Sequence, residues 1–458
     1  MALVVSLAAA VAFFLIRPLL GAQGDYAPRH SSGSAYWLLV AALFVPYAIA
    51  LRERRRCARP SPTTLFAVAA VLYVAMIPAA AQQSQDLYQN LVYGRMALHG
   101  LDPYTVPPSA MADPWRSWAL WGTTTTVYGP VWTILSTAVA WLSDGSLAVA
   151  FLLVKASTCA LVLVATRALA STVAEGGGES GSGSDPGMTV LAFAYNPMVM
   201  FSIALGAHAD AAVAAAFAGA MLAARRGRDG WATFLLVVAA LVKVYAGLVL
   251  LAWLAALFRR RGAGSAIRNI TLAAAVTTLA YLPFWAGSKT LGGLVRIGGD
   301  ASASLTGSLI RIASGSTSNA VAAGTSEAGE AGRVVVIALL AVAVVAAIGR
   351  SARGDPWHSG ALLLGAYVLL APWYLSWHLV GLIALVAIDP MSPFALATLA
   401  FSGTSLFVGF GSSAAGLAAQ TAVRYAPPLA VFAVARGRVS DRSAPTPSGD
   451  IARALSTG

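Results

Sequence analysis

The sequence predicts an all-α polytopic membrane protein, and three observations support this fold class. Of its 458 residues, 58% are hydrophobic and only 10% are charged, whereas about 25% of residues are charged in soluble domains. The mean hydropathy is +0.73, which excludes intrinsic disorder because disordered chains combine low hydrophobicity with high charge. The apolar residues form continuous runs near the ~20 residues that cross a bilayer as a helix, unlike the alternating strands of a membrane β-barrel.

The apolar runs divide the chain into about 14 segments, from which we expect a bundle of about 12–14 transmembrane helices. They cover residues 2–20, 35–51, 64–81, 128–142, 146–168, 188–205, 210–224, 231–258, 267–285, 334–348, 359–371, 375–388, 393–410 and 414–435. We expect one transmembrane domain over residues 1–439 and a disordered cytoplasmic tail over 440–458. The first run lacks a basic start, so we interpret it as a span, with a signal-like segment as the alternative.

Basic residues predict the side of the membrane on which each loop lies. The 30 Lys and Arg residues exceed the 18 Asp and Glu residues, which gives a net charge of +12. The basic clusters occupy short loops at 52–59, 225–228 and 259–261, and such loops stay in the cytoplasm. We therefore expect contact with membrane lipids and no binding of nucleic acid. Cys57 lies in a basic loop and Cys159 in an apolar run, so no disulfide is expected.

The same sidedness places two long, less apolar segments outside the cytoplasm. Segment 82–127 is rich in Trp, Tyr and Pro and predicts short helices on the membrane surface, and segment 287–332 is rich in Gly and Ser. Residues 231–258 are too long for one straight span and too short for two, so we expect a broken hairpin with Lys243 near its outer tip. Irregular backbone at this depth must be covered by protein or line a cavity. Four apolar runs lie between the outer segment 82–127 and the cytoplasmic loop 225–228, where an odd number of crossings is required. We therefore expect one segment within 128–224 to be re-entrant.

Asp86 is the first candidate for chemistry because it lies just beyond the outer end of a span. A carboxylate that is partly shielded from water has a raised pKa and acts as a base. Arg95 lies in the same segment, and its guanidinium group suits a phosphate. Residue chemistry alone favours a plainer interpretation, in which Asp86 caps a helix and Arg95 faces lipid headgroups. Tyr88, Asp102 and Tyr128 are candidate substrate-binding residues in the same region.

Three further candidates lie at span ends or breaks. His208 and Asp210 begin a span, where they orient an acceptor, cap the helix or ligate a metal, although two ligands support a metal only weakly. Lys243 interrupts an apolar run, and a lysine at membrane depth needs an anionic partner, such as a phosphate, or a route to the headgroups.

Segment 372–378, with the sequence PWYLSWH, separates two apolar runs. Trp373 and Tyr374 fit an aromatic belt at the membrane interface, but this role does not explain His378. Arg296 in the second outer segment is a phosphate candidate, with surface solvation as its plainer role.

Five stretches, taken in order, resemble the GT-C superfamily of integral-membrane glycosyltransferases, and the likeness is closest to the actinobacterial polyprenyl-phosphate-mannose-dependent mannosyltransferases. They are SQDLYQNLVYGRMALHGLDPY, VYGPVW, YNPMVMFSIALGAHADA, RRGRDGWATFLLVVAALVKVYA and APWYLSWHL, which run from residue 84 to about residue 380. No single stretch is specific, but their order is. The family's His-Asn-Asp element has Ala209 at its middle position here.

The resemblance implies a GT-C-type bundle with extracytoplasmic loop helices and a role in cell envelope biosynthesis. The implied reaction moves mannose, with inversion, from a polyprenyl-phosphate donor to a glycolipid or glycan acceptor outside the cytoplasm. The family's catalytic acidic residue falls on Asp86, as general base, and His378 would assist it. The implied phosphate-binding residues are Arg95, Lys243 and Arg296, and the implied substrate-binding residues are Tyr88, Asp102, Tyr128, His208, Asp210, Trp373 and Tyr374. No cofactor or metal is expected, with a divalent metal as the alternative.

Other functions stay open at this point. A transporter or flippase would show an inverted repeat with paired broken helices, and only the interruption at Lys243 is evident. A ligase or polymerase that moves a whole lipid-linked glycan would use overlapping chemistry. A non-catalytic scaffold would lose no sugar transfer when Asp86 is changed.

Overall fold

The computed structural model describes residues 42–56, 60–79, 81, 84–176, 185–298, 300–302, 304–351, 354–406 and 413–443. These residues form helices joined by turns and contain no strand. The all-α fold class predicted from the sequence is therefore confirmed. The expected span at 2–20, the start of the run at 35–51, Cys57 and most of the linker 176–187 lie outside the described residues.

The helices follow one another along the chain as α3 (Phe44–Arg54), α4 (Pro62–Met76), α5 (Asp86–Leu98), α6 (Pro130–Leu142), α7 (Leu147–Ala174), α8 (Pro186–Ala194), α9 (Pro197–Met200), α10 (Asp210–Arg225), α11 (Asp229–Val242), α12 (Gly247–Tyr281), α13 (Gly292–Gly298), α14 (Leu305–Ala313), α15 (Ala320–Gly324), α16 (Glu327–Ser351), α17 (Pro356–Leu370), α18 (Leu379–Val386), α19 (Pro393–Thr404) and α20 (Ala414–Ser443). Short 3-10 turns lie at Pro108–Ala110, Pro114–Trp118, Val244–Ala246, Leu282–Phe284, Gly287–Leu291 and Ser376–His378. The helix α20 includes the first residues of the expected 440–458 tail, and the rest of that tail lies outside the described residues.

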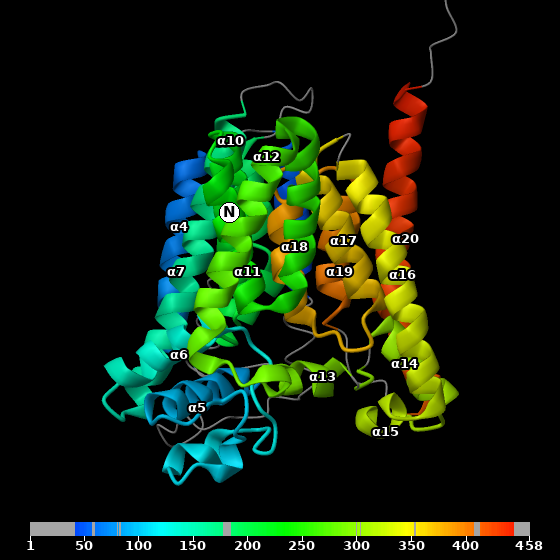
Figure 1. Ribbon diagram of the computed structural model, residues 1–458. Coiled ribbons are helices and arrows are strands. Elements are labelled where there is room, and N and C mark those ends of the chain that lie inside the picture. Colours follow the sequence, from blue (N-terminus) through cyan, green and yellow to red (C-terminus); the bar gives the residue numbers. More distant parts are fainter. Residues whose placement is uncertain are drawn as a thin grey trace, which may run out of the picture.

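Three helical stretches in the described residues are long and apolar enough to cross a bilayer, namely Leu147–Ala174, Val244–Phe284 and Glu327–Ser351. The pair Pro186–Ala194 and Pro197–Leu205, bent by 54°, brings the number to four if it counts as one span. Shorter apolar helices of 10–17 residues pack in the same bundle. The chain is thus a polytopic membrane protein (Figure 1), and the expected total of about 12–14 spans stays a prediction.

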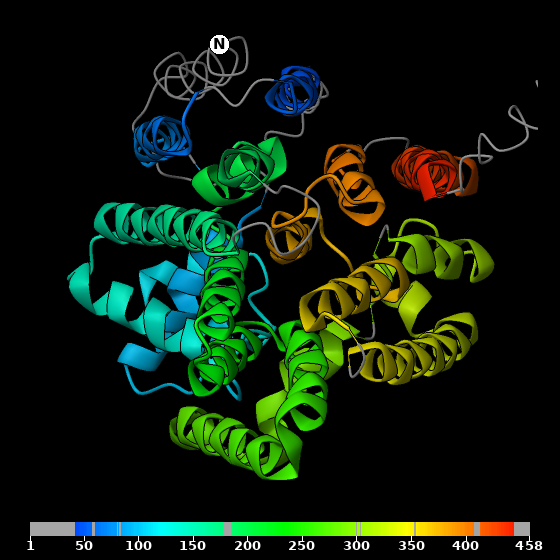
Figure 2. The same ribbon diagram turned by 90° about the horizontal axis from the view of Figure 1, so that it is seen from above.

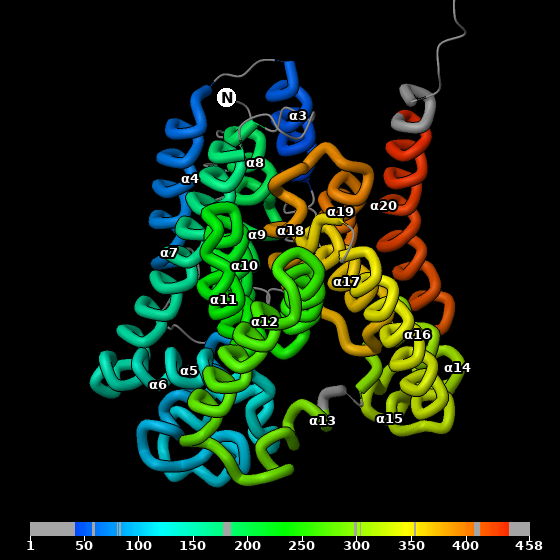
Figure 3. The backbone as a smooth tube through the Cα atoms, turned by 45° about the horizontal axis from the view of Figure 1, so that its top comes forward, coloured from blue at the N-terminus to red at the C-terminus, as the bar shows by residue number. Residues whose placement is uncertain are grey.

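The two ends of the bundle differ in character (Figures 1 and 3). One end, here called the loop end, carries α5 and α13–α15. The other, the basic end, carries the loops with Arg54, Arg226 and Arg260. Arg226 pairs with Glu175 at 2.6 Å, and Arg261 pairs with Asp229 at 3.4 Å, so the loops that carry Arg226 and Arg260 lie together. Seen from this direction in Figure 2, the helices surround a central region rather than forming one row.

Four of the helices that start at the basic end share a sequence signature, a Ser or Asp followed by proline. The pairs are Ser61-Pro62, Asp185-Pro186, Asp355-Pro356 and Ser392-Pro393. The first residue accepts a hydrogen bond from a free backbone N–H of the first turn. Proline fits the next position because its missing N–H has no partner there in any helix. In α17 the carboxylate of Asp355 accepts from Trp357 N at 3.0 Å.

Helix α6 explains why the number of apolar runs in 128–224 does not match the number of crossings. Its N-cap residue, Gly129, donates its N–H to the carbonyl of Val242 at 3.0 Å, near the break between α11 and α12. The following helix, α7, ends at Ala174, next to Glu175 at the basic end, so α7 begins at the loop end. Both ends of α6 therefore lie toward the loop end, and α6 enters the bundle without crossing it.

The expected broken hairpin over 231–258 is present. Helix α11 ends at Val242, Lys243 has an extended backbone with φ −142° and ψ 123°, and a 3-10 turn leads into α12. Helix α12 then changes direction at Gly262, whose φ is 80°. Glycine reaches this left-handed region without a steric penalty. The break consequently places Lys243 toward the loop end and the basic cluster 259–261 at the opposite end.

Candidate active site

The turn that carries His208 departs from a regular helix at three successive points. The side chain of Asn196 caps α9 by accepting from Met198 N at 2.9 Å, and a π-helical turn follows over Phe201–Leu205. Ala207 then has a φ of 50°, which is uncommon for a residue other than glycine. Such π-helical turns are frequent at functional sites. The chain thereby reverses inside the bundle and leaves His208 and Asp210 completely buried.

Asp86 begins α5 and is only 5% exposed. Its Oδ2 accepts a hydrogen bond from the hydroxyl of Tyr128 at 3.2 Å. His208 Nδ1 lies 3.5 Å from the same oxygen, at the outer limit of a hydrogen bond. Both contacts are made to the same oxygen, Oδ2.

The pKa of Asp86 corrects one expectation. Shielding from water was expected to raise it, and burial does act in that direction. The close contact with His208 and the charges of His208 and Lys243 act against burial, and together they lower the pKa of Asp86 below its ordinary value of 3.8. The carboxylate is consequently ionised at neutral pH, which is the form that accepts a proton.

Lys243 forms a second polar group beside the first. Its Nζ pairs with Asp210 Oδ2 at 2.7 Å, and the hydroxyl of Tyr245 donates to Asp210 Oδ1. The same Nζ lies 5.4 Å from the ring centroid of Tyr128. Because Tyr128 also bonds Asp86, it links the two polar groups. A lysine ammonium has three donor hydrogens, so two remain beyond the bond to Asp210.

The second outer segment fixes the aromatic stretch that leads to His378. The hydroxyls of Ser302 and Ser304 donate to the carbonyl of Pro372 at 3.0 and 2.8 Å, and Tyr374 N donates to Ser302 Oγ at 2.9 Å. The side chain of His378 is buried, with its ring centroid 5.3 Å from that of Tyr245. Among the described residues, its Nδ1 has no hydrogen-bond partner, and a buried polar atom of this kind calls for one.

These groups meet at one small cavity of about 90 Å³ at the loop end. It is lined by Asp86, Trp121, Val127, Tyr128, Lys243, Val244, Tyr245, Leu294, Tyr367, Trp373, Leu375, Trp377 and His378. The arrangement combines an ionised carboxylate, a lysine and three indole rings. It can accept a proton, bind an anion and contact the faces of a sugar ring.

Comparison with known protein families identifies the family to which the chain belongs. The family model described as "Alpha-(1->6)-mannopyranosyltransferase, N-terminal domain" matches residues 2–261, which is more than half of the chain. The chain belongs to this family. The match bears out the resemblance to membrane mannosyltransferases noted from the sequence, and its range includes Asp86, His208 and Lys243. No curated protein matches the chain. As a mannosyltransferase, the protein uses a sugar donor and an acceptor.

The structure of this mannosyltransferase separates Arg95 from the cavity. Its Nε pairs with Asp113 Oδ2 at 2.7 Å, and its guanidinium carbon lies 4.7 Å from the ring centroid of Trp115. Both partners belong to the first outer segment. Because the Arg95 side chain is committed to this ion pair and does not line the cavity, we remove it from the phosphate site expected from the sequence.

Four other expected site residues also lie away from the cavity. Arg296 is exposed on α13 and donates to the carbonyl of Thr123 at 3.1 Å. Asp102 accepts from Tyr104 N at 3.0 Å and so stabilises a local turn. Tyr88 stacks on Trp118, with ring centroids 5.5 Å apart.

Tyr374 is buried against Phe401, with ring centroids 5.9 Å apart. The packing of these residues supports the outer segments rather than the cavity. Trp373, in contrast, lines the cavity as a substrate-binding residue would.

Four aromatic residues of the cavity were not expected from the sequence, namely Trp121, Tyr245, Tyr367 and Trp377. Two of them had a signal in the pattern, because Tyr245 follows Lys243 in the break and Trp377 precedes His378. Trp121 and Tyr367 had no such signal. The folding of a long loop brings Trp121 to the cavity, and the packing of α17 brings Tyr367 there.

Metal binding has little support in the described residues, where no group of three or more His, Cys, Asp and Glu side chains could hold an ion. The expectation that transfer needs no metal or cofactor stays a prediction, because a phosphate donor can itself supply ligands to a magnesium ion.

Proposed function

We propose that the protein transfers mannose from a polyprenyl-phosphate donor to a lipid-linked or glycan acceptor, with Asp86 as general base. The observation that carries this proposal is that Asp86 and Lys243, far apart in sequence, line the same cavity. The family match supports mannosyl transfer over transport. Because the basic loops lie at the opposite end of the bundle, the positive-inside rule favours an active site outside the cytoplasm.

The reaction would proceed as a direct displacement. Asp86 accepts the proton of the acceptor hydroxyl, and the hydroxyl oxygen forms a bond to C1 of mannose. The bond between C1 and the phosphate oxygen breaks, and polyprenyl phosphate leaves with the electron pair. Attack from the opposite face inverts C1, so a β-linked donor gives an α-linked mannoside. A base in reach of the hydroxyl contributes roughly 10²–10⁴-fold to the rate.

Lys243 would hold the phosphate as its negative charge develops. Its bond to Asp210 keeps the side chain in place while two donor hydrogens stay available. Positive charge fixed where the leaving group becomes more negative stabilises the transition state. Asp210 and Tyr245 act here by orienting Lys243.

The donor's lipid chain needs a route from the bilayer to the cavity. Val244 lines the cavity and is also 62% exposed, on the outer surface of the bundle. Its apolar side chain therefore marks an edge of the cavity where a polyprenyl chain can remain in lipid while the phosphate reaches Lys243. Trp373 and Trp377 provide flat apolar faces beside the sugar position.

The decisive experiment is a transfer assay with purified full-length protein. We expect radiolabelled mannose to move from polyprenyl-phosphate mannose, and not from GDP-mannose, to a mannan or glycolipid acceptor. Transfer from GDP-mannose alone would overturn the donor assignment. Release of a whole glycan from a lipid carrier, without single mannose transfer, would favour the ligase or polymerase function.

A further inference from the structure

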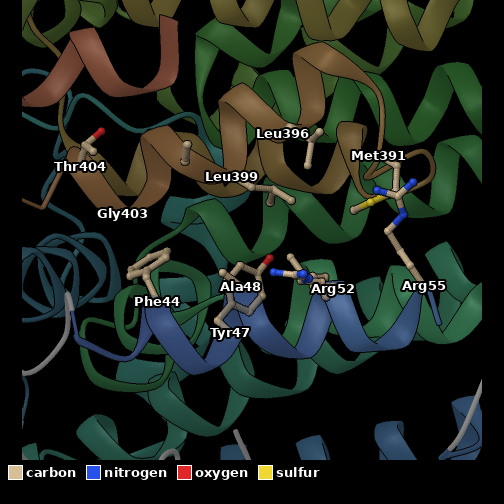
Figure 4. Close-up of a pocket in the computed structure, with 12 residues that line it drawn as sticks. Phe44, Tyr47, Ala48, Arg52, Arg55, Met391, Leu396, Leu399, Gly403 and Thr404 are labelled. Atoms are coloured by element: carbon tan, nitrogen blue, oxygen red, sulfur yellow. The ribbon is translucent and has the colours of Figure 1, made fainter. Parts of the chain in front are cut away.

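A second and larger hollow lies on the bundle at the basic end, away from Asp86. It is a groove of about 470 Å³ between α3 and α19. Figure 4 shows Arg52 and Arg55 toward the end near Met391, and Phe44 with Thr404 toward the other end. Between these ends the lining is mainly apolar, with Ala48, Leu51, Leu396, Leu399 and Ala400.

The floor and the closed end of the groove are fixed by specific contacts. Tyr47 of α3 donates its hydroxyl to the carbonyl of Ala192 at 2.8 Å, and Asn196 Nδ2 donates to Ser402 Oγ of α19 at 3.0 Å. At the far end, a Cβ on Gly403 would lie 3.2 Å from Cδ1 of Phe44, so the two helices approach closely there. The groove is therefore formed in advance of any ligand, which lowers the cost of binding.

The arginines at the open end of the groove differ in whether they have an ion-pair partner. Arg54 pairs with Asp185, and Arg56 pairs with Glu53 at 3.2 Å. Arg52 and Arg55 are exposed and form no ion pair with a carboxylate in the part of the chain that the structure describes. Two such guanidinium groups at the mouth of an apolar groove match a ligand with an anionic head and an apolar tail, because arginine pairs with phosphate through two parallel hydrogen bonds.

We propose that this groove binds an anionic glycerophospholipid. One acyl chain lies between α3 and α19, and the phosphate contacts Arg52 and Arg55. From Arg52 to Phe44 the helix rises about 12 Å, which accommodates the upper part of the chain. A zwitterionic lipid fits less well, because its own cation opposes the two arginines. The site is independent of the mannose-transfer cavity and does not rest on the proposed reaction.

Native mass spectrometry of the full-length protein tests the preference for an anionic headgroup. Phosphatidylglycerol and phosphatidylcholine with the same acyl chains are compared at equal concentrations. We expect wild type to retain phosphatidylglycerol at least about tenfold better, and the double substitution Arg52→Gln/Arg55→Gln to abolish this preference. The control Arg436→Gln/Arg438→Gln removes the same charge from exposed positions of α20 and should preserve it. Equal retention of both lipids by wild type, or an unchanged preference in Arg52→Gln/Arg55→Gln, overturns the proposal.

A second experiment asks what occupies the groove itself. Ala48 is exposed on its wall, so Ala48→Trp fills the groove without disturbing the buried core. We expect that variant to lose phosphatidylglycerol retention while both arginines are intact. A photo-crosslinker at position 48 should capture phosphatidylglycerol. Unchanged retention in Ala48→Trp, absence of lipid capture, or capture of residues 2–41 of the same chain would show that no lipid lies there.

Discussion

The imidazole of His208 stacks on the indole of Trp377, with ring centroids 3.9 Å apart and ring planes at 13°. The backbone of Gly206 also lies close to the ring, because a Cβ on Gly206 would lie 2.7 Å from His208 Nε2. The ring is thus confined by Trp377 and by Gly206, and its Nδ1 lies 3.5 Å from Asp86 Oδ2. This arrangement suits His208 as a positioning residue for the proposed base, and it leads to the first prediction.

His208→Gln should move the acidic limb of the pH–activity profile to higher pH. The ionised form of Asp86 is present above its pKa and is lost as the pH falls through it. His208 helps to lower that pKa, so its removal raises the pKa and activity fails at a less acidic pH. The measurement is kcat/KM against pH, which reports the base of the free enzyme. The control is His99→Gln, whose side chain is 51% exposed and lies near Asp113. A limb that stays in place, or moves to lower pH, contradicts the assignment.

Asp86→Asn should reduce turnover by roughly 10²–10⁴-fold while the protein still folds, because the amide keeps the size of the carboxyl group and loses its basicity. Asp102→Asn is the matched control. Asp102 lies in the same outer segment, and an asparagine oxygen can still accept the bond from Tyr104 N. Transfer rates for both variants, measured with purified protein of normal elution volume, give the comparison. Near-normal transfer by Asp86→Asn would falsify the proposed mechanism.

Lys243→Met should weaken donor binding more than acceptor binding, because it removes the charge and keeps the apolar stem. It also leaves Asp210 buried without its cation, and breaking a buried pair costs about 3–5 kcal/mol of stability. The double substitution Lys243→Met/Asp210→Asn separates the two effects. It should recover much of the thermal stability and still bind the donor weakly. Titration of each substrate against each variant measures this, and recovery of donor affinity in the double variant would exclude Lys243 as a phosphate ligand.

Gly129→Ala should damage both folding and transfer through a single steric contact. A Cβ at this position would lie 2.0 Å from the carbonyl oxygen of Leu241, so α6 and the end of α11 would have to separate. That shift displaces both Tyr128, which precedes α6, and Lys243, which follows α11. Overpacking of this kind costs about 1–3 kcal/mol, observable as a lower midpoint of thermal unfolding. Gly122→Ala is the control, since no atom lies within 4 Å of the place that its new methyl group would take; equal midpoints for both variants would contradict the argument.

The sequence was informative for residues whose chemistry conflicts with their surroundings. Asp86, Lys243 and His378 are ionisable groups beside breaks in apolar runs, and an ionisable group near lipid requires polar partners or water. That requirement predicts from the sequence alone that these three residues lie close together in the fold. Lys155 shows the limit of the same rule, because it is fully buried in α7 and donates to the carbonyl of Ala79 instead of reaching the cavity.

The remaining parts of the site depend on how the outer segments fold, which local patterns do not specify. Arg95 had the right chemistry for a phosphate, but the turn over Pro114–Trp118 presents Asp113 to it. Trp121 reaches the cavity because its backbone N–H donates to Gln89 Oε1 at 2.9 Å, a contact between two segments of the same loop. Neither pairing has a signal in spacing or periodicity. The number of spans is similarly ambiguous, since helices of 10–17 residues serve either as spans or as supports.

Sidedness provides the last prediction, because a polyprenyl-phosphate donor and an extracytoplasmic acceptor require the cavity to face outward. Asp113 is a poor position for labelling, since its carboxylate is held by Arg95. Ser117 is exposed in the same segment, and Ala263 is exposed beside the arginines of the basic end. In a background of Cys57→Ser/Cys159→Ala, an impermeant thiol reagent should label Ser117→Cys in intact cells and Ala263→Cys only after permeabilisation, because short arginine-rich loops resist translocation. The reverse pattern would place Asp86 on the cytoplasmic side. The cavity could then act only on a donor exposed to the cytoplasm, and the polyprenyl-phosphate assignment would fail even if mannose transfer itself were observed.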